Sequence, residues 1–211
     1  MNNKSNISII GGAGHVGFAL GLIFSSKGFK VSLIDNDLEK INKINVSKVP
    51  FLEENSQKLL NSMIRKKRIF ATNQLIEVLK SKYIIVCIGT PINKQLNPSL
   101  RSFISFFYRL KKFLKKNQIV IIRSSIYPGI CDKIYKIIGN KCKNLSYCPE
   151  RIVQGKSIIE LPKLPQLVSG KSKKAIAESG RLFRKVCKKI IYTEVIEAEL
   201  IKLFSNAYRY I

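Results

Sequence analysis

The stretch IIGGAGHVGFALGL, residues 9–22, decides the fold of this chain. The stretch begins inside a short β-rich apolar run, ISIIG at 7–11. It then contains Gly12, Gly14 and Gly17 and continues as an apolar segment with helical spacing. Glycines at this spacing permit a tight turn and let the backbone approach a pyrophosphate, which then lies at the positive N-terminus of the helix. The order strand, glycine turn and helix predicts a dinucleotide-binding unit.

An acidic residue ends the second predicted strand. Asp35 closes KVSLID at 30–35 and follows Gly14 by 21 residues. A carboxylate there accepts hydrogen bonds from a ribose 2′-hydroxyl and repels a 2′-phosphate, so the sequence favours NAD over NADP. The alternative is a glycine-rich turn followed by an aspartate that only caps the next helix. The full context favours the cofactor, and we expect His15 and Val16 in the turn to contribute to its binding.

Apolar runs and helical stretches alternate along the rest of the chain. Further strands are expected at 68–72, 83–90, 118–124, 144–149 and 189–193. Helices are expected at 16–27, from residue 37, and at 99–116, 128–138, 172–187 and the C-terminal end, with a loop rich in Pro and Gly between 150 and 172. Alternation of this kind predicts an α/β fold with a doubly wound, mainly parallel sheet of the Rossmann type.

The charge of the chain raises the question of nucleic acid. Its formal net charge is +25, with 45% hydrophobic and 24% charged residues among 211. Such a charge favours nucleic acid, anionic membranes or phosphorylated ligands. Here lysines greatly outnumber arginines and are spread along the chain, and the aromatic residues fall mostly at apolar positions of periodic segments. Specific nucleic-acid readers depend on Arg and exposed stacking aromatics, so we disfavour this class.

Cysteine usage and the N-terminus indicate the compartment. The chain has five cysteines, no C-x2-C pair and one histidine, His15, so neither a metal site nor a disulfide framework is expected. The apolar run after MNNKSN is too short for a signal peptide, and no apolar stretch approaches the roughly 20 residues that span a bilayer. We therefore expect a cytoplasmic protein that is not inserted in a membrane.

Polar residues follow three of the apolar strands. Thr90 and Ser125 would face a cofactor crevice at the carboxyl ends of the sheet, although each hydroxyl could equally cap the following helix. Glu150 follows a strand and a proline, where a carboxylate could act as a general base on water. Its alternative is a surface ion pair with Arg151.

The last stretch, AELIKLFSNAYRYI at 198–211, places Lys202 and Asn206 four residues apart. On a helix both side chains project from the same face. A cation and an amide donor side by side could hold an oxygen that gathers negative charge during a reaction.

Taken in order, these motifs make the chain resemble the nucleotide-sugar dehydrogenases, the family of UDP-glucose 6-dehydrogenase and UDP-N-acetylmannosamine dehydrogenase. The resemblance is carried by GGAGHVG, VPFLEE, ATN, IGTPINKQLNP, RSSIYPG, CPERIVQGK, ELPKLPQLVSG and AELIKLFSNAYRY. The CPERIVQGK and LPQLVSG motifs look more like the branch that oxidises N-acetylated amino sugars.

The resemblance implies a two-step oxidation of a UDP-sugar, in which the C6 alcohol becomes an aldehyde, a cysteine-bound thioester and a carboxylate while two NAD are reduced. It implies that Gly12, Gly14, Gly17 and Asp35 bind NAD, with Thr90 and Ser125 beside it. It implies that Glu150 assists thioester hydrolysis and that Lys202 and Asn206 stabilise the oxyanion, with Ser125 close to the reaction. Arg151, Gln154 and Lys156 would lie near the substrate.

The chain departs from the family pattern at Asn93, where an acid is common, at Gln154, where an acid is often found, and in two further respects. Ser125 stands where the family usually has Thr, and the second α/β domain with its GG-x-C-x-PKD nucleophile motif has no counterpart among these residues. We therefore expect an NAD-binding domain at 1–194 and the start of a central dimerisation helix at 195–211, truncated. Such a chain would bind NAD without completing the oxidation, and would work with a separately encoded C-terminal half or be a remnant.

A homodimer through the final helix is expected, because that helix would leave Leu200, Leu203, Phe204 and Ala207 in need of apolar cover. Two other functions remain as alternatives. One is a β-hydroxyacid dehydrogenase, a group that shares the Rossmann domain and a Lys-x-x-x-Asn helix. The other is a basic nucleic-acid-binding module on a Rossmann scaffold.

Overall fold

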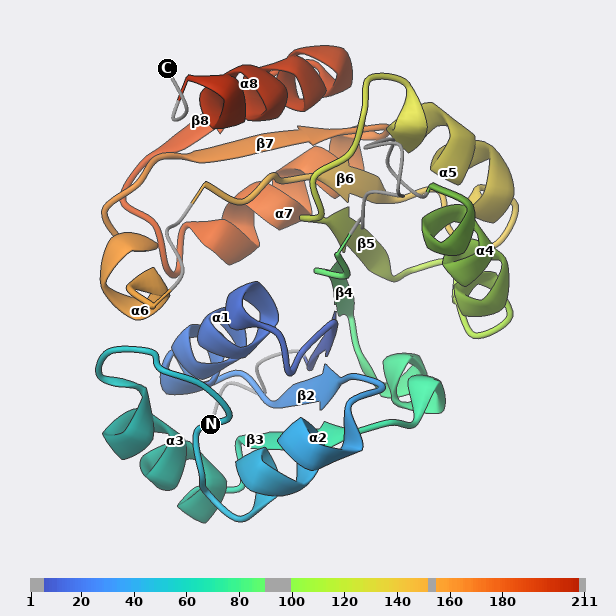
Figure 1. Ribbon diagram of the computed structural model, residues 1–211. Coiled ribbons are helices and arrows are strands. Elements are labelled where there is room, and N and C mark those ends of the chain that lie inside the picture. The colour runs from blue at the N-terminus through green and yellow to red at the C-terminus, as the bar shows by residue number, and fades with distance from the viewer. Residues whose placement is uncertain (1–5, 90–99, 152–154, 209–211) are drawn as a thin grey trace.

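A computed structural model describes residues 6–89, 100–151 and 155–208 of the chain (Figure 1). Its centre is an eight-stranded sheet in the order β3-β2-β1-β4-β5-β6-β7-β8. Neighbouring strands are parallel except for β6 and β7, which are antiparallel. The strands are β1 Ile7–Ile10, β2 Val31–Ile34, β3 Ile69–Thr72, β4 Tyr83–Val86, β5 Ile119–Ile122, β6 Leu145–Tyr147, β7 Gln166–Gly170 and β8 Ile190–Tyr192.

Helices cover both faces of the sheet (Figure 1). They are α1 His15–Ser26, α2 Leu38–Asn45, α3 Ser56–Arg65, the short 3-10 helix η1 Leu75–Lys80, α4 Leu100–Lys111, α5 Ile130–Ile138, α6 Ser157–Glu160, α7 Lys173–Phe183 and α8 Val195–Ala207. Within the described ranges, none of these helices has the length and apolar character that crossing a membrane requires. The fold is the doubly wound, mainly parallel Rossmann-type sheet that the alternating pattern predicts.

Two separate cores explain why β5, in the middle of the sheet, is apolar throughout. Ile119 and Ile121 of β5 belong to the core under α1, α3 and α7, whereas Val120 and Ile122 belong to the core under η1, α4, α5 and α8. Successive residues of a strand point to opposite faces, so a strand covered on both sides favours apolar residues at every position.

The sequence interpretation was wrong about one strand. QLVSG, which we assigned to a loop, forms β7 and pairs antiparallel with β6 through Tyr147 and Ser169. The flanking prolines and the terminal glycine conceal this strand, because they are typical of loops. The predicted strand at 83–90 is also shorter, since β4 ends at Val86.

The final helix packs against the sheet domain through a buried carboxylate. Glu199 of α8 is 1% exposed, and its two carboxylate oxygens accept hydrogen bonds from the backbone N–H groups of Gly129 at 2.8 Å and Cys131 at 3.0 Å. These donors belong to the first turn of α5, whose N-terminus favours negative charge. Val195 and Ala198 are buried on the same side. The Lys202 face of α8 is thereby fixed relative to the strand ends.

Candidate active site

Two cavities meet at the carboxyl end of β4, next to the point where the strand order reverses between β1 and β4. In an open α/β sheet this switch point is where ligands bind. Cavity A, about 410 Å³, is lined by Ile10, Gly11, Ile34, Asp35, Asn36, Asn73, Leu75, Ile88, Gly89, Ser102, Phe103, Phe106 and Arg109. Cavity B, about 330 Å³, is lined by His15, Val16, Cys87, Ile88, Gly89, Arg123, Ser124, Ser125, Glu150, Ser157 and Lys202.

The glycine turn lies between the two cavities. Two of its glycines are required by packing, whereas a third is not. A Cβ on Gly17 would lie 2.2 Å from the carbonyl oxygen of Gly11, and one on Gly12 would lie 2.7 Å from that of Ile9. A Cβ on Gly14 would meet only the Gly11 carbonyl oxygen, at an ordinary 3.4 Å. Gly14 is the N-cap of α1, and the first turn of that helix holds no acidic residue. The space that Gly14 leaves open therefore fits a pyrophosphate at a helix N-terminus.

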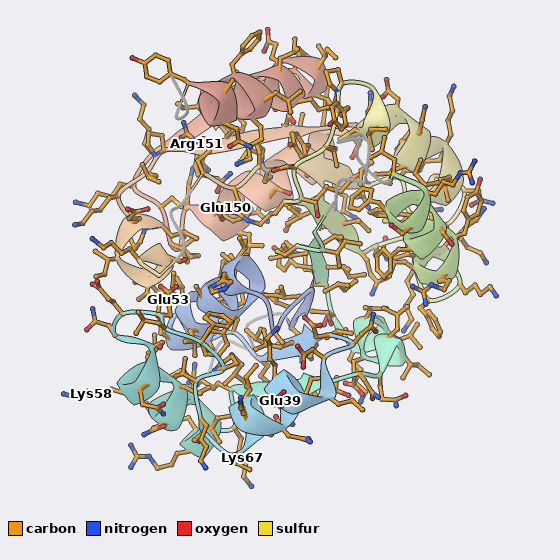
Figure 2. The ribbon with its side chains drawn as sticks, viewed as in Figure 1. Glu39, Glu53, Lys58, Lys67, Glu150 and Arg151 are labelled. Carbon is orange, nitrogen blue, oxygen red and sulfur yellow. The ribbon has the colours of Figure 1, made fainter. Side chains whose placement is uncertain are left out.

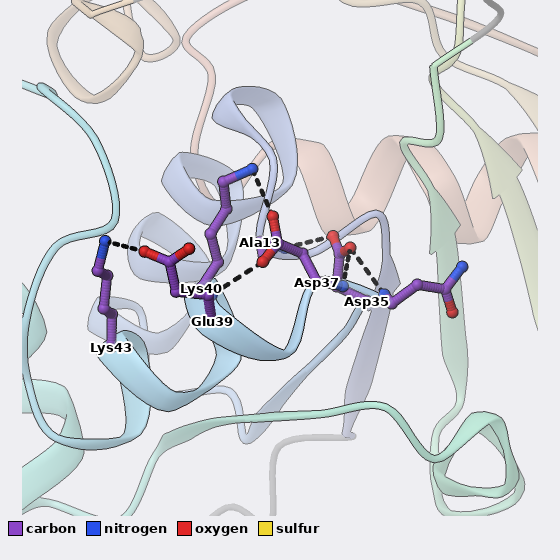
Figure 3. A network of polar contacts seen from close by, with 7 residues as sticks. Ala13, Asp35, Asp37, Glu39, Lys40 and Lys43 are labelled. Atoms are coloured by element: carbon purple, nitrogen blue, oxygen red, sulfur yellow. Dashed lines mark hydrogen bonds and ion pairs between the residues drawn. The ribbon is translucent and has the colours of Figure 1, made fainter.

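Asp35 is held at the edge of cavity A by this same turn (Figure 3). Its Oδ2 accepts a hydrogen bond from the N–H of Ala13 at 2.9 Å, and its Oδ1 accepts from the N–H of Asn36 at 2.8 Å. The cap of α2 is a different residue, Asp37, which accepts from the N–H of Lys40 at 3.1 Å. The alternative in which Asp35 only caps the next helix is therefore wrong, and its position suits a ribose hydroxyl.

Glu150 lies on cavity B and is buried, with 8% of its surface exposed (Figure 2). Its carboxylate forms an ion pair with Arg123, so the alternative of a surface ion pair with Arg151 is wrong. The N–H of Arg151 donates to Oε1 of Glu150 at 2.7 Å, while the Arg151 guanidinium donates to the carbonyl oxygen of Pro165. A guanidinium in contact favours the ionised form of the carboxylate.

Arg123 is a residue of this site that the sequence interpretation missed. It is 2% exposed, its Nη1 donates to Oε1 of Gln166 at 2.8 Å, and its guanidinium lies 4.9 Å from the centre of the Phe183 ring. Burial lowers the pKa of Arg123 from its ordinary value. The available signal was its place directly after the apolar run QIVII, because a cation at the end of a buried strand requires a partner.

Lys202 and Asn206 project from one face of α8, as their spacing predicts. The Lys202 ammonium donates to Oδ1 of Asn206 at 3.0 Å, and Lys202 is 8% exposed and lines cavity B. Ser125 lines the same cavity, so the structure brings Lys202, Ser125 and Glu150 together. Asn206 is half-buried beside Lys202.

The expected substrate residues are less concentrated. Arg151 is half-buried and Lys156 is exposed at the N-cap of α6, while the following residue, Ser157, lines cavity B. Thr90 and Gln154 lie outside the described residues. Among the described residues of this segment, Glu150 and Ser157 line cavity B.

No cysteine of this chain has the properties of an activated nucleophile. All five are free thiols, and Cys87 lines cavity B. Burial raises the pKa of Cys87 to about 12, so the thiol stays protonated at neutral pH. Over the described ranges, no group of three or more His, Cys, Asp or Glu side chains is placed to hold a metal ion.

Comparison with known proteins agrees with this geometry. Residues 5–190 match the model of the UDP-glucose/GDP-mannose dehydrogenase family, NAD binding domain. UDP-N-acetyl-D-mannosamine dehydrogenase of Pyrococcus horikoshii is 26% identical over 206 residues, which are 94% of this chain and 49% of that protein. UDP-glucose 6-dehydrogenase of Rickettsia felis is 26% identical over 213 residues, which are 96% of this chain and 47% of that protein.

A solved structure gives the same result in three dimensions. That of the UDP-D-ManNAc dehydrogenase from Pyrococcus horikoshii matches with a TM-score of 0.89 and 25% identity over 97% of this chain and 50% of that one. The chain thus spans about half the length of the relatives it matches. It belongs to the UDP-glucose/GDP-mannose dehydrogenase family, whose NAD-binding domain it contains, and its cofactor is NAD.

Proposed function

We propose that this chain is the NAD-binding portion of a UDP-sugar 6-dehydrogenase, which oxidises the C6 alcohol of a nucleotide sugar to a carboxylate for polysaccharide precursor synthesis. The observation that carries the proposal is the junction of the two cavities at the end of β4. Asp35 borders cavity A, whereas Ser125, Glu150 and Lys202 border cavity B. A dinucleotide that extends from A into B would bring its reactive end beside these three side chains.

The residues around the glycine turn would hold the cofactor, which accepts a hydride from the substrate carbon when bound. Gly14 leaves room for the pyrophosphate. The N–H groups of His15 and Val16 lie in the first turn of α1, where they have no partner within the helix and can donate to a phosphate. Asp35 would accept hydrogen bonds from the ribose hydroxyls.

The residues around cavity B would handle charge and protons. Lys202 supplies a positive charge where the substrate oxygen becomes negative, and its hydrogen bond to Asn206 orients the ammonium. Glu150, which pairs with Arg123, can accept a proton from the water that hydrolyses a thioester. The Ser125 hydroxyl lines the same space and can orient the substrate alcohol or the cofactor.

We propose an N-acetylated hexosamine as the sugar. Relatives with the name UDP-N-acetyl-D-mannosamine dehydrogenase, at 26% and 28% identity, support this choice, as does the CPERIVQGK motif. Cations in or beside that motif, Arg151 and Lys156, suit the diphosphate of a nucleotide sugar.

We propose that the cysteine of the thioester step comes from outside these 211 residues, because burial raises the pKa of all five thiols. We propose that it comes from a C-terminal half, in the same or a separate polypeptide, joined to the NAD-binding domain at 1–194 through the helix at 195–211. That helix would also form a homodimer contact. The five free thiols suit a reducing cytoplasm.

A titration of the purified chain with NADH, followed by fluorescence at two salt concentrations, tests the proposal. We expect saturable binding, weaker binding of NADPH, and little effect of salt. A folded chain that binds neither nucleotide would contradict it. Steeply salt-dependent binding of DNA or RNA in a parallel titration would instead favour the nucleic-acid module that the charge of +25 suggests.

A further inference from the structure

The segment 49–54, which we call the strap, contacts the first residue of α1 on one side and the segment 155–158 on the other. At one end the Phe51 ring lies on the imidazole of His15, with ring centres 3.9 Å apart, and meets the edge of Phe18 at 5.5 Å. His15 is the first residue of α1 and lines cavity B. The strap therefore contacts the helix end at which the phosphates of NAD would bind.

At its other end the strap is hydrogen-bonded to residues about 100 positions later in the chain. Glu53 is 5% exposed, and its Oε2 accepts a hydrogen bond from the Ser157 hydroxyl at 3.2 Å. Its Oε1 accepts from the N–H of Ile158 at 3.1 Å. The N–H of Glu54 donates to the carbonyl oxygen of Gly155 at 3.0 Å. Figure 2 labels Glu53, which lies on the strap beside α6.

These contacts reach the segment 155–158, which borders the site at Ser157. Ser157 lines cavity B, and Gly155 has a φ of +87°, a conformation that an L-residue rarely adopts. A Cβ on Gly155 would lie 3.9 Å from the carbonyl oxygen of Leu52, so strap and turn pass close to each other. Burying a carboxylate is unfavourable unless the carboxylate is well hydrogen-bonded. An apolar side chain would therefore suffice if position 53 only had to pack the loop against its neighbours.

We propose that Glu53 is a positioning residue that couples the cofactor site to the segment 155–158, which forms part of the wall of cavity B through Ser157. NAD bound at the N-terminus of α1 restrains His15 and Phe51, the strap transmits this restraint, and Glu53 orders Ser157 and Ile158. Because coupling between two sites is reciprocal, a ligand against this wall also strengthens NAD binding. The inference rests on the proposed function in taking cavity B as the substrate side.

Hydrogen exchange of the whole chain, followed by mass spectrometry with and without saturating NADH, tests this coupling. We expect NADH to slow exchange in a peptide that covers 155–161 by at least about fivefold, the lower range of allosteric coupling. In Glu53→Ala this NADH-dependent slowing should be lost while NADH still binds. Glu53→Gln, which retains one acceptor oxygen, should keep part of it. Phe51→Ala should lose it from the other end of the strap.

The matched control is Glu54→Gln, next to Glu53 but with an exposed side chain, and it should keep the full effect of NADH. A purely structural role for Glu53 would speed exchange equally with and without NADH. Equal slowing by NADH in Glu53→Ala and the original chain would overturn the proposal, as would binding of NADH without any slowing. Fluorescence on the same samples separates these results from a failure of the cofactor site, in which NADH does not bind at all.

Discussion

Arg123 and Glu150 form an ion pair inside the protein, where the ends of β5 and β6 meet cavity B. The Arg123 side chain is fully buried and that of Glu150 is 11% exposed. Gln166 of β7 and the ring of Phe183 complete the surroundings of the guanidinium. One catalytic candidate is thus held by the antiparallel strand that distinguishes this sheet from a fully parallel one.

Replacement of Arg123 by Met should be severely destabilising, because it leaves the Glu150 carboxylate buried without its cation. We expect the free energy of unfolding to fall by about 3–5 kcal/mol, as measured by urea denaturation. Arg181→Met is the control, since Arg181 pairs with Glu178 at 2.6 Å on the surface and is 64% exposed. It should cost no more than about 1 kcal/mol. Equal costs for the two variants would contradict the buried pair.

Asp35 and Asp37 offer a matched pair for the cofactor. Asp35→Asn should weaken NADH binding by about tenfold, the effect of losing a charge-assisted hydrogen bond, and should narrow the preference over NADPH. Asp37→Asn should leave NADH binding unchanged, because the Asp37 side chain caps α2 by accepting a hydrogen bond from the N–H of Lys40. Nucleotide titrations by fluorescence measure both. An equal loss of NADH affinity in the two variants would mean that Asp35 affects binding only through the local structure and does not contact the cofactor.

Substitutions at Gly14 and Gly17 should distinguish an effect on cofactor binding from an effect on folding. Gly14→Ala should fold with a nearly unchanged melting temperature, since its Cβ would meet only a 3.4 Å contact, but it should lose NADH binding because the methyl group takes the place of the pyrophosphate. Gly17→Ala should be destabilised, because its Cβ would lie 2.2 Å from the Gly11 carbonyl oxygen. Tight NADH binding by Gly14→Ala would place the cofactor elsewhere.

The sequence predicts well what depends on local pattern. The glycine turn, the apolar strands on both sides of the switch point and the shared face of Lys202 and Asn206 follow from periodicity and spacing. These features are decided within a few residues, and they sufficed to identify the fold and the cofactor. They also placed Ser125 and Glu150 at strand ends, where cavity B lies.

Features that depend on distant partners could not be predicted in this way. β7 becomes a strand because β6 and β8 pair with it, although its own sequence begins after Pro165 and ends in Gly170. Arg123 belongs to the candidate site because Glu150 and Gln166, which are distant in the sequence, contact it. Likewise, the VPFLEE motif gave no sign that Glu53 would contact Ser157.

Cys148 should make the protein sensitive to alkaline pH. Burial raises the pKa of this thiol from 9.0 to about 12. Between these values the unfolded chain loses the proton and the folded chain keeps it, so the stability present below pH 9 declines as the pH rises toward 12, by up to about 1.4 kcal/mol per pH unit for one group. Burial raises the pKa of Tyr83 and Tyr147 too, which adds to the same trend.

Urea denaturation at pH 8 and at about pH 10.5 measures this loss. Cys148→Ala should be less stable at pH 8, because it removes a buried side chain, but its stability should decline less steeply with pH. Tyr108→Phe is the control, since this ring is 58% exposed, and its pH dependence should match that of the original chain. If stability declines equally with pH in all three proteins, Cys148 has the same protonation state in the folded and the unfolded chain, and the prediction is wrong.

The exposed side of α8 should drive self-association. Ile196, Leu200, Phe204 and Tyr208 follow one another at intervals of four residues and are 48%, 39%, 69% and 81% exposed. An apolar row of this kind is unfavourable in water and suits a second copy of the helix or a further domain. Sedimentation of the purified chain should therefore show a concentration-dependent dimer.

Phe204→Glu should raise the dissociation constant of this dimer more than tenfold, because the charge would be buried in the contact. Phe70→Glu introduces the same charge on β3, at a ring that is 45% exposed, and should leave association unchanged. A chain that stays monomeric at high concentration, or that dimerises equally well with Phe204→Glu, would show that this face of α8 is not the contact.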